Sequence, residues 1–166
     1  MNPMQEIRIE KVTLNMGCAG DKVKIEKAQK FLEKIIDQKS YVTSSKKRTT
    51  FGSTKGKPIG VKVTLRKEKA KIFLKDAFEA IDKKMKIKQV NNGNFSFGIK
   101  ESIDIPNVKY DSEIGIVGLD VCVTLERPGF CVKKRGIKQA KIGKNHLISK
   151  EQTVNWIKNW GVSIDG

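Results

Sequence analysis

PIGVKVTLRKEKAKIFLKDAFEAIDKKM (Pro58–Met85) is the stretch that decides the fold of this chain. Apolar residues alternate with polar or small ones in its first part, which predicts a half-buried strand over Pro58–Arg66. They recur at helical spacing in its second part, which predicts a helix over Lys67–Met85. Both segments are apolar on one side only, so we expect the helix to cover the strand through Phe73, Leu74, Phe78 and Ile81.

Similar patterns surround this unit. Gln5–Met16 reads as a strand whose apolar phase slips near Glu10, which indicates a bulge. Asp21 can cap a following helix that runs through Asp37. Shorter strands are predicted over Tyr41–Thr43, Asn94–Ile99 and Leu119–Leu125. This order predicts an α+β fold, an antiparallel sheet with two helices packed on one face. The other face would present Thr13, Asn15, Lys62 and Thr64.

The C-terminal part is different in kind. After ERPGF (Glu126–Phe130) the chain is basic and nearly aperiodic until Ser149, which forms a capping-box signal with Gln152. A short amphipathic helix with two tryptophans follows and should end at Gly161. We therefore expect one α+β domain over residues 1–126 and a basic arm over 127–166. The arm is too polar to fold alone, and we expect nucleic acid to order it while its terminal helix packs on the body.

A basic connection, SSKKRTTFGSTKGK (Ser44–Lys57), precedes the central strand. It has five basic residues, no acidic ones and a single aromatic, Phe51. A positive loop carried by a rigid strand suits contact with phosphates, and the aromatic ring suits packing on a base or ribose. An ordinary solvated loop is the alternative, and the charge of the whole chain favours nucleic acid.

That charge is +16 over 166 residues, more than solubility requires. Eight further basic residues lie in Arg127–Lys150 without an acid, whereas Glu101–Glu126 holds six acids and one lysine. Two positive zones and one negative zone predict different partners for different faces. The negative zone is a candidate contact with a protein.

Enzyme and metal chemistry find no support in the sequence. The three cysteines form no CxxC pair, His146 is the single histidine, and Gly17–Gly20 lacks the ending of a phosphate-binding loop. Cys122 reads as a small core residue of its strand. We expect a reduced cytoplasmic protein with no cofactor, since the N-terminus lacks the apolar core of a signal peptide and no apolar run suits a membrane span. A free RNA chaperone is the alternative function, and a purely protein adaptor would leave the clustered cations unexplained.

Several stretches together resemble the universal large-subunit ribosomal protein five family. They are EKVTLNMG (Glu10–Gly17), the segment from Asp37 to Arg66, GNFSFGI (Gly93–Ile99) and the segment from Tyr110 to Phe130. The similarity covers nearly the whole chain. The ERPGF continuation and the arm resemble the archaeal and eukaryotic branch, and the sequence of Pro58–Arg66 is closer to archaeal members.

The resemblance implies binding to 5S rRNA and large-subunit rRNA at the central protuberance. The family's 5S-facing positions match Asn15, Gln38, Phe51 and Thr64, and the cations Lys46, Lys47 and Arg48 stand beside them. The family's loop toward peptidyl-site tRNA matches Thr49–Lys57, with Gly52, Ser53, Thr54, Lys55, Gly56 and Lys57 as its tip. Contacts of the arm with rRNA are expected from Arg127, Lys133, Lys134, Arg135, Lys138, Lys141 and Lys144.

The resemblance also implies protein partners, a neighbouring 5S-associated ribosomal protein and a small-subunit head protein. The second would form an intersubunit bridge, for which Asp104–Gly118 is the candidate segment. One departure is Ser40, where relatives usually carry proline after GQK. It leaves open the angle at which the short strand Tyr41–Thr43 begins.

Overall fold

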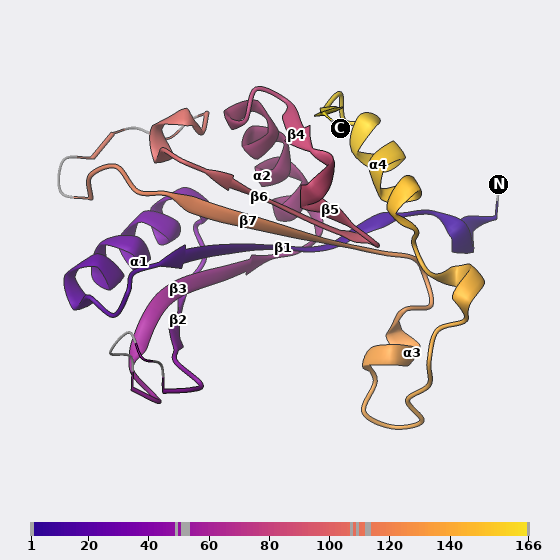
Figure 1. The fold of residues 1–166 in the computed structure, drawn as a ribbon, viewed down its shortest axis with the longest axis horizontal. Coiled ribbons are helices and arrows are strands. Elements are labelled where there is room, and N and C mark those ends of the chain that lie inside the picture. The colour runs from indigo at the N-terminus through magenta and orange to yellow at the C-terminus, as the bar shows by residue number, and fades with distance from the viewer. Residues whose placement is uncertain are drawn as a thin grey trace.

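The computed structural model describes residues 2–48, 50, 54–106, 108, 110–111 and 114–165 (Figure 1). A long sheet carries helices on one side, and a basic segment leaves it at each end. The helices are α1 (Lys22–Ile36), α2 (Lys67–Ala80), α3 (Cys131–Lys134) and α4 (Lys150–Lys158). The strands are β1 (Arg8–Gly17), β2 (Tyr41–Ser44), β3 (Pro58–Leu65), β4 (Lys84–Lys86), β5 (Val90–Asn91), β6 (Asn94–Ile99), β7 (Leu119–Glu126) and β8 (Ser163–Asp165).

Six strands form the main sheet in the order β2-β3-β1-β7-β6-β5, and all neighbours are antiparallel. The predicted α+β fold is therefore confirmed. The register of β1 against β7 shifts between Ile9 and Lys11, which confirms the predicted bulge. A side chain at Gly60 would come within 2.5 Å of the Met16 carbonyl oxygen, so glycine allows β3 to approach β1 closely.

Alternation places one face of the sheet in the core. Val12, Leu14 and Met16 of β1 are buried, and the matching residues of β3, β6 and β7 are buried with them. Asp21 caps the start of α1, because its carboxylate accepts a hydrogen bond from the Val23 N–H, and Asp37, in the left-handed region, caps its end. The helix prediction for this segment is confirmed at both ends.

The second helix is shorter than predicted. It ends at Ala80, because Asp82 and Lys83 both have positive φ and cannot continue a helix. Met85 is nevertheless buried, as a residue of β4, which pairs in parallel with β8. The apolar spacing identified a core residue correctly but assigned it to the wrong element.

The two helices share the sheet between them. α1 packs chiefly on β3, and α2 packs chiefly on β1. The Phe78 ring contacts Phe95 and Phe97 of β6, with centroids 6.1 and 5.7 Å away, and Trp160 at 6.0 Å. We predicted that Phe78 packs on β3, and this was wrong. The helix instead packs on β1, next to β3, and its Phe78 ring reaches β6.

The C-terminal helix packs on the body as predicted. The Ser149–Gln152 capping box is present at its start. Ile157 is fully buried, and the Trp156 ring lies 6.1 Å from that of Phe95. Ile148 and Val162 belong to the same core. Within the C-terminal arm, the residues that lie away from the core are therefore mainly those between Phe130 and Leu147. In the part of the chain that the structure describes, no helix is long and apolar enough to cross a membrane.

Candidate nucleic-acid interface

The polar face is the side of the main sheet opposite α1 and α2. Its side chains form two rows, each made of residues that are paired across successive strands. The Lys62 row runs Tyr41, Lys62, Asn15, Asp120. The Thr13 row runs Thr64, Thr13, Cys122, Ser96. These residues are exposed or half-buried, so the face is open to a flat partner.

Three of the expected 5S-facing residues come together here. Asn15 and Thr64 lie in adjacent rows on neighbouring strands. Gln38 follows α1 in the sequence, yet its side-chain amide donates a hydrogen bond to the Thr64 carbonyl oxygen at 3.3 Å. This bond brings residues 26 positions apart to the edge of the sheet beside Thr64. A backbone contact holds the amide, which leaves its side-chain oxygen available as an acceptor.

Ser40 stabilises the turn that positions Gln38. Its N–H and its hydroxyl both donate hydrogen bonds to the Glu33 carboxylate, at 3.1 and 3.0 Å. These bonds, with the nearby Lys39 charge, hold the pKa of Glu33 below its ordinary value despite some desolvation. Proline could make neither bond. The strand β2 pairs with β3 in one register from Tyr41 to Thr43, so the departure at Ser40 does not disturb its start.

The basic connection between β2 and β3 projects from one end of the sheet (Figure 1). Lys46, Lys47 and Arg48 are exposed, as are Thr54 and Lys55. Phe51, Gly52 and Ser53, together with Thr49, lie outside the described residues.

Gly56 and Lys57 were expected at the tip of this loop, and the structure places them at its base. The Ser45 N–H donates to the Lys57 carbonyl oxygen at 2.8 Å, and the Gly56 N–H donates to the Ser45 carbonyl oxygen at 2.9 Å. A side chain at Gly20 would come within 2.7 Å of Lys57 Cε, so Lys57 lies along the body. The tip is therefore shorter than the sequence suggested.

Arg127 was expected to contact RNA, but it is buried, with 6% of its surface exposed. Its guanidinium donates hydrogen bonds to the His146 carbonyl oxygen at 3.3 Å and to the Gln152 side chain at 3.0 Å. Arg127 therefore connects the start of the segment that contains α3 to its end, where the chain enters α4. Charge alone could not separate this internal cation from the exposed ones.

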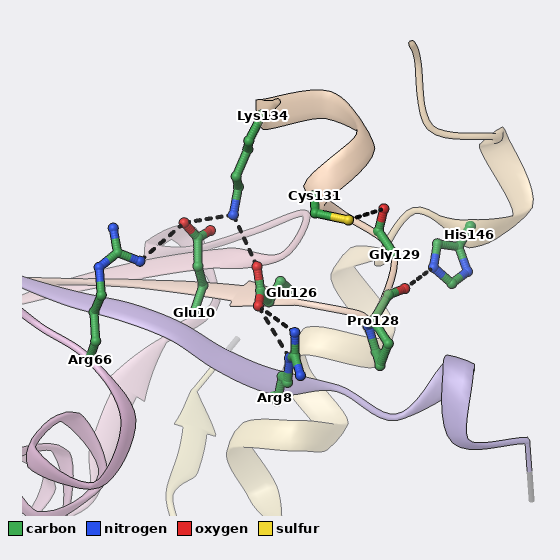
Figure 2. A network of polar contacts seen from close by, with 9 residues as sticks. All are labelled: Arg8, Glu10, Arg66, Glu126, Pro128, Gly129, Cys131, Lys134 and His146. Atoms are coloured by element: carbon green, nitrogen blue, oxygen red, sulfur yellow. Dashed lines mark hydrogen bonds and ion pairs between the residues drawn. The ribbon is translucent and has the colours of Figure 1, made fainter. Parts of the chain in front are cut away.

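Lys134 anchors α3 to the sheet (Figure 2). Its ammonium lies 2.7 Å from a Glu10 carboxylate oxygen and 3.0 Å from one of Glu126. Arg66 approaches Glu10 at 3.9 Å, and Arg8 approaches Glu126 at 2.9 Å. The Glu10 side chain is only 9% exposed, because the bulge in β1 places it beneath these cations. We call these five residues the anchor network.

The anchor network shifts two pKa values. Partial burial alone would raise the pKa of Glu126, but hydrogen bonds and charges from Lys134 and Arg8 more than offset it and lower the pKa. Partial burial alone would lower the pKa of Lys134, and the two glutamates more than offset it and raise the pKa. Both residues are therefore stabilised in their charged forms.

The other expected cations of the arm remain on its surface. Lys133, Arg135, Lys138, Lys141 and Lys144 are all exposed. The segment was predicted to be nearly aperiodic, yet it contains α3, and the Arg135 side chain donates to the Lys138 carbonyl oxygen at 2.7 Å. His146 lies 2.8 Å from the Pro128 carbonyl oxygen and contacts the Phe130 ring edge-on. The arm is thus folded back on itself at its base.

Sequence reasoning missed two features of this surface. Cys122 was predicted to be a core residue, but it is exposed at the centre of the polar face. Its position between the buried residues Val121 and Val123 was the signal. Arg8, Glu10 and Glu126 were not identified as anchors for the arm. Pairing Glu126 with Arg8 requires the strand register, which the sequence did not provide.

Comparison with known proteins identifies the family of this chain. Residues 2–50 match the family model described as Ribosomal protein L5, and residues 58–156 match the model of the C-terminus of the same ribosomal family. The chain belongs to the ribosomal protein L5 family. It is 43% identical over 165 residues to the large ribosomal subunit protein uL5 of Archaeoglobus fulgidus, covering 99% of this chain and 93% of that one. It is 46% identical to the uL5 proteins of Methanococcus aeolicus and Nanoarchaeum equitans, covering 98% and 93% of this chain and 93% of each relative.

Family membership confirms the resemblance deduced from the sequence, including its archaeal character. A member of this family is a structural ribosomal protein, not an enzyme, and its partner is rRNA. As a protein of the large ribosomal subunit, it is located in the cytoplasm.

Proposed function

We propose that this chain is a structural constituent of the large ribosomal subunit that docks its polar face on 5S rRNA at the central protuberance. The observation that carries the proposal is the uncovered polar face itself. Asn15 and Thr64 lie close together on it, and Gln38, from a third segment, is bonded to the Thr64 backbone at its edge. Helices cover the opposite face, so the polar face is the broad surface left for RNA.

Charge supports a contact of this kind. Lys62 lies within the polar face, and exposed cations stand on both flanking segments. Glu10 and Glu126, at the end of the sheet nearest α3, are both paired with cations. RNA backbone can therefore approach without facing these two carboxylates as free charges. The arm would reach large-subunit rRNA through Lys133, Arg135, Lys138, Lys141 and Lys144, whereas Arg127 and Lys134 would hold the arm in place.

Two further contacts belong to the same proposal. The loop between β2 and β3 would approach peptidyl-site tRNA through a tip ending near Lys55. The segment Asp104–Gly118 would meet a small-subunit head protein and contribute to an intersubunit bridge. This segment borders an apolar cavity of about 490 Å³ between α1 and α2, lined in part by Ile35, Phe73, Ile105 and Ile114. Ile72 and Ile103, which line this cavity, are exposed, and such exposed apolar side chains favour a protein partner on that side, with the 5S-associated protein as a further neighbour.

Binding to folded 5S rRNA at several salt concentrations tests the main proposal. Replacing Asn15 and Thr64 together by alanine should weaken binding with little change in the salt slope, since neither residue neutralises a phosphate. Replacing Lys46 or Lys47 by glutamine should reduce the slope by about one unit for each phosphate that is no longer neutralised. Unchanged affinity of the Asn15/Thr64 variant would exclude the polar face. Equal affinity of the native protein for an unstructured RNA would instead indicate a free chaperone.

A further inference from the structure

The Tyr41 side chain lies outside the core that the described residues form. Tyr41 begins β2, an edge strand of the main sheet, and 65% of its surface is exposed. It does not belong to the core or to the apolar residues packed against the core. A single exposed aromatic residue is ordinary in itself. What sets Tyr41 apart is its neighbours on the polar face.

Tyr41 pairs with Lys62 across the strands, and Lys62 pairs in turn with Asn15. The Lys62 ammonium lies 5.3 Å from the centroid of the Tyr41 ring. Neighbouring strands are about 4.8 Å apart, so the ring, the ammonium and the Asn15 amide span roughly 10 Å in one line. That line offers a stacking surface, a cation and a hydrogen-bonding amide within the reach of one nucleotide.

The other end of the Lys62 row limits where RNA can lie on the polar face. Asp120 pairs with Asn15 on the far side from Lys62 and is exposed. A carboxylate there disfavours a phosphate over β7. The favourable part of the row therefore covers β2, β3 and β1 and ends at Asn15.

We propose that Tyr41, Lys62 and Asn15 form a subsite for one unpaired RNA nucleotide. The base stacks on the exposed part of the Tyr41 ring, Lys62 binds the adjoining phosphate, and Asn15 meets the sugar or the base edge. An unpaired nucleotide is required because a base within a helix has no free face for the ring. The inference rests on the proposed function and deepens it, since it names the kind of nucleotide that the polar face takes.

The test measures binding of folded 5S rRNA to variants at Tyr41. Tyr41→Ala should weaken binding roughly 5- to 150-fold, the range for removal of one base–aromatic stack, and should leave the salt slope unchanged. Tyr41→Phe should bind nearly as the native protein does, because the ring remains. Lys62→Gln should lower the salt slope by about one unit.

Tyr110→Ala is the matched control, because Tyr110 is the other tyrosine, is 62% exposed and lines the cavity on the helical side. It should bind normally. The subsite is contradicted if Tyr41→Ala binds normally while the Asn15/Thr64 variant is weakened, or if Tyr41→Ala loses only stability. Failure of the native protein to bind 5S rRNA would instead contradict the proposed function itself.

Discussion

At the scale of single residues, Phe78 contacts more parts of the core than its position in the sequence indicates. It is 2% exposed and connects α2 with β6 and with Trp160 near the C-terminus. One ring thus ties the central helix to segments on both sides of it. Truncation would leave a cavity bounded by rings that cannot easily collapse.

We expect Phe78→Ala to lower the free energy of unfolding by about 3–5 kcal/mol, because it removes a large buried ring. Urea denaturation of the two proteins measures the difference. Ile72→Ala is the control, since Ile72 is an apolar residue of the same helix that is 64% exposed, and its replacement should cost no more than about 0.5 kcal/mol. A loss below about 1 kcal/mol for Phe78→Ala would show that α2 does not cover the sheet as described.

At the scale of elements, the anchor network ties α3 to the sheet through ion pairs and hydrogen bonds between charged side chains. The pKa of Glu126 is lowered from its ordinary value of 4.5, so its ion pairs contribute fully above that pH and are lost as the pH falls below it. The pKa of Lys134 is raised from 10.5, so its contribution is present below that pH and is lost above it. The anchor should therefore hold at neutral pH and weaken in acid.

Hydrogen exchange at the Arg135 amide measures how firmly the anchor network holds α3. The amide donates to the Cys131 carbonyl oxygen within the α3 turn. Its protection, corrected for the intrinsic rate, should fall as the pH drops from neutral to below 4.5, and Glu126→Gln should lower it already at neutral pH. The Asn159 amide, which donates to the Asn155 carbonyl oxygen in α4, is the control. Equal protection of Arg135 in the native protein and in Glu126→Gln would mean that other contacts hold α3.

The same scale shows what the sequence could predict. Periodicity identified β1, β3, α1 and the start of α2, because each has one apolar face. It extended α2 too far, because the positive φ angles at Asp82 and Lys83 leave no signal in those residue types. It missed β4, β5 and β8, which are two or three residues long and too short to show a period.

The candidate interface was likewise predicted only in part. Alternation predicted which face Asn15, Lys62 and Thr64 share, since the period of a strand fixes the side of each residue. Arg127 and Lys134 were predicted to bind RNA because composition cannot distinguish a cation with a protein partner from one in solvent. Tyr41 was not considered, because its significance depends on its pairing with Lys62.

At the scale of the whole molecule, the chain separates two kinds of surface. The polar face has basic segments at both ends, and the net charge of +16 is concentrated in them. The helical side has the apolar cavity and borders the acidic segment. The proposed function assigns RNA to the polar face and proteins to the helical side, which suits a position at the edge of a ribonucleoprotein.

Cys122 offers the most direct test of the central claim, that the polar face docks on 5S rRNA. It is exposed at the centre of that face, whereas Cys18 is buried, and Cys131 can be replaced by serine. The experiment compares the alkylation rate of Cys122 in the free protein and in its complex with folded 5S rRNA at one fixed pH. We predict strong protection of Cys122 in the complex. Alkylation at the same rate in a fully formed complex would contradict the account.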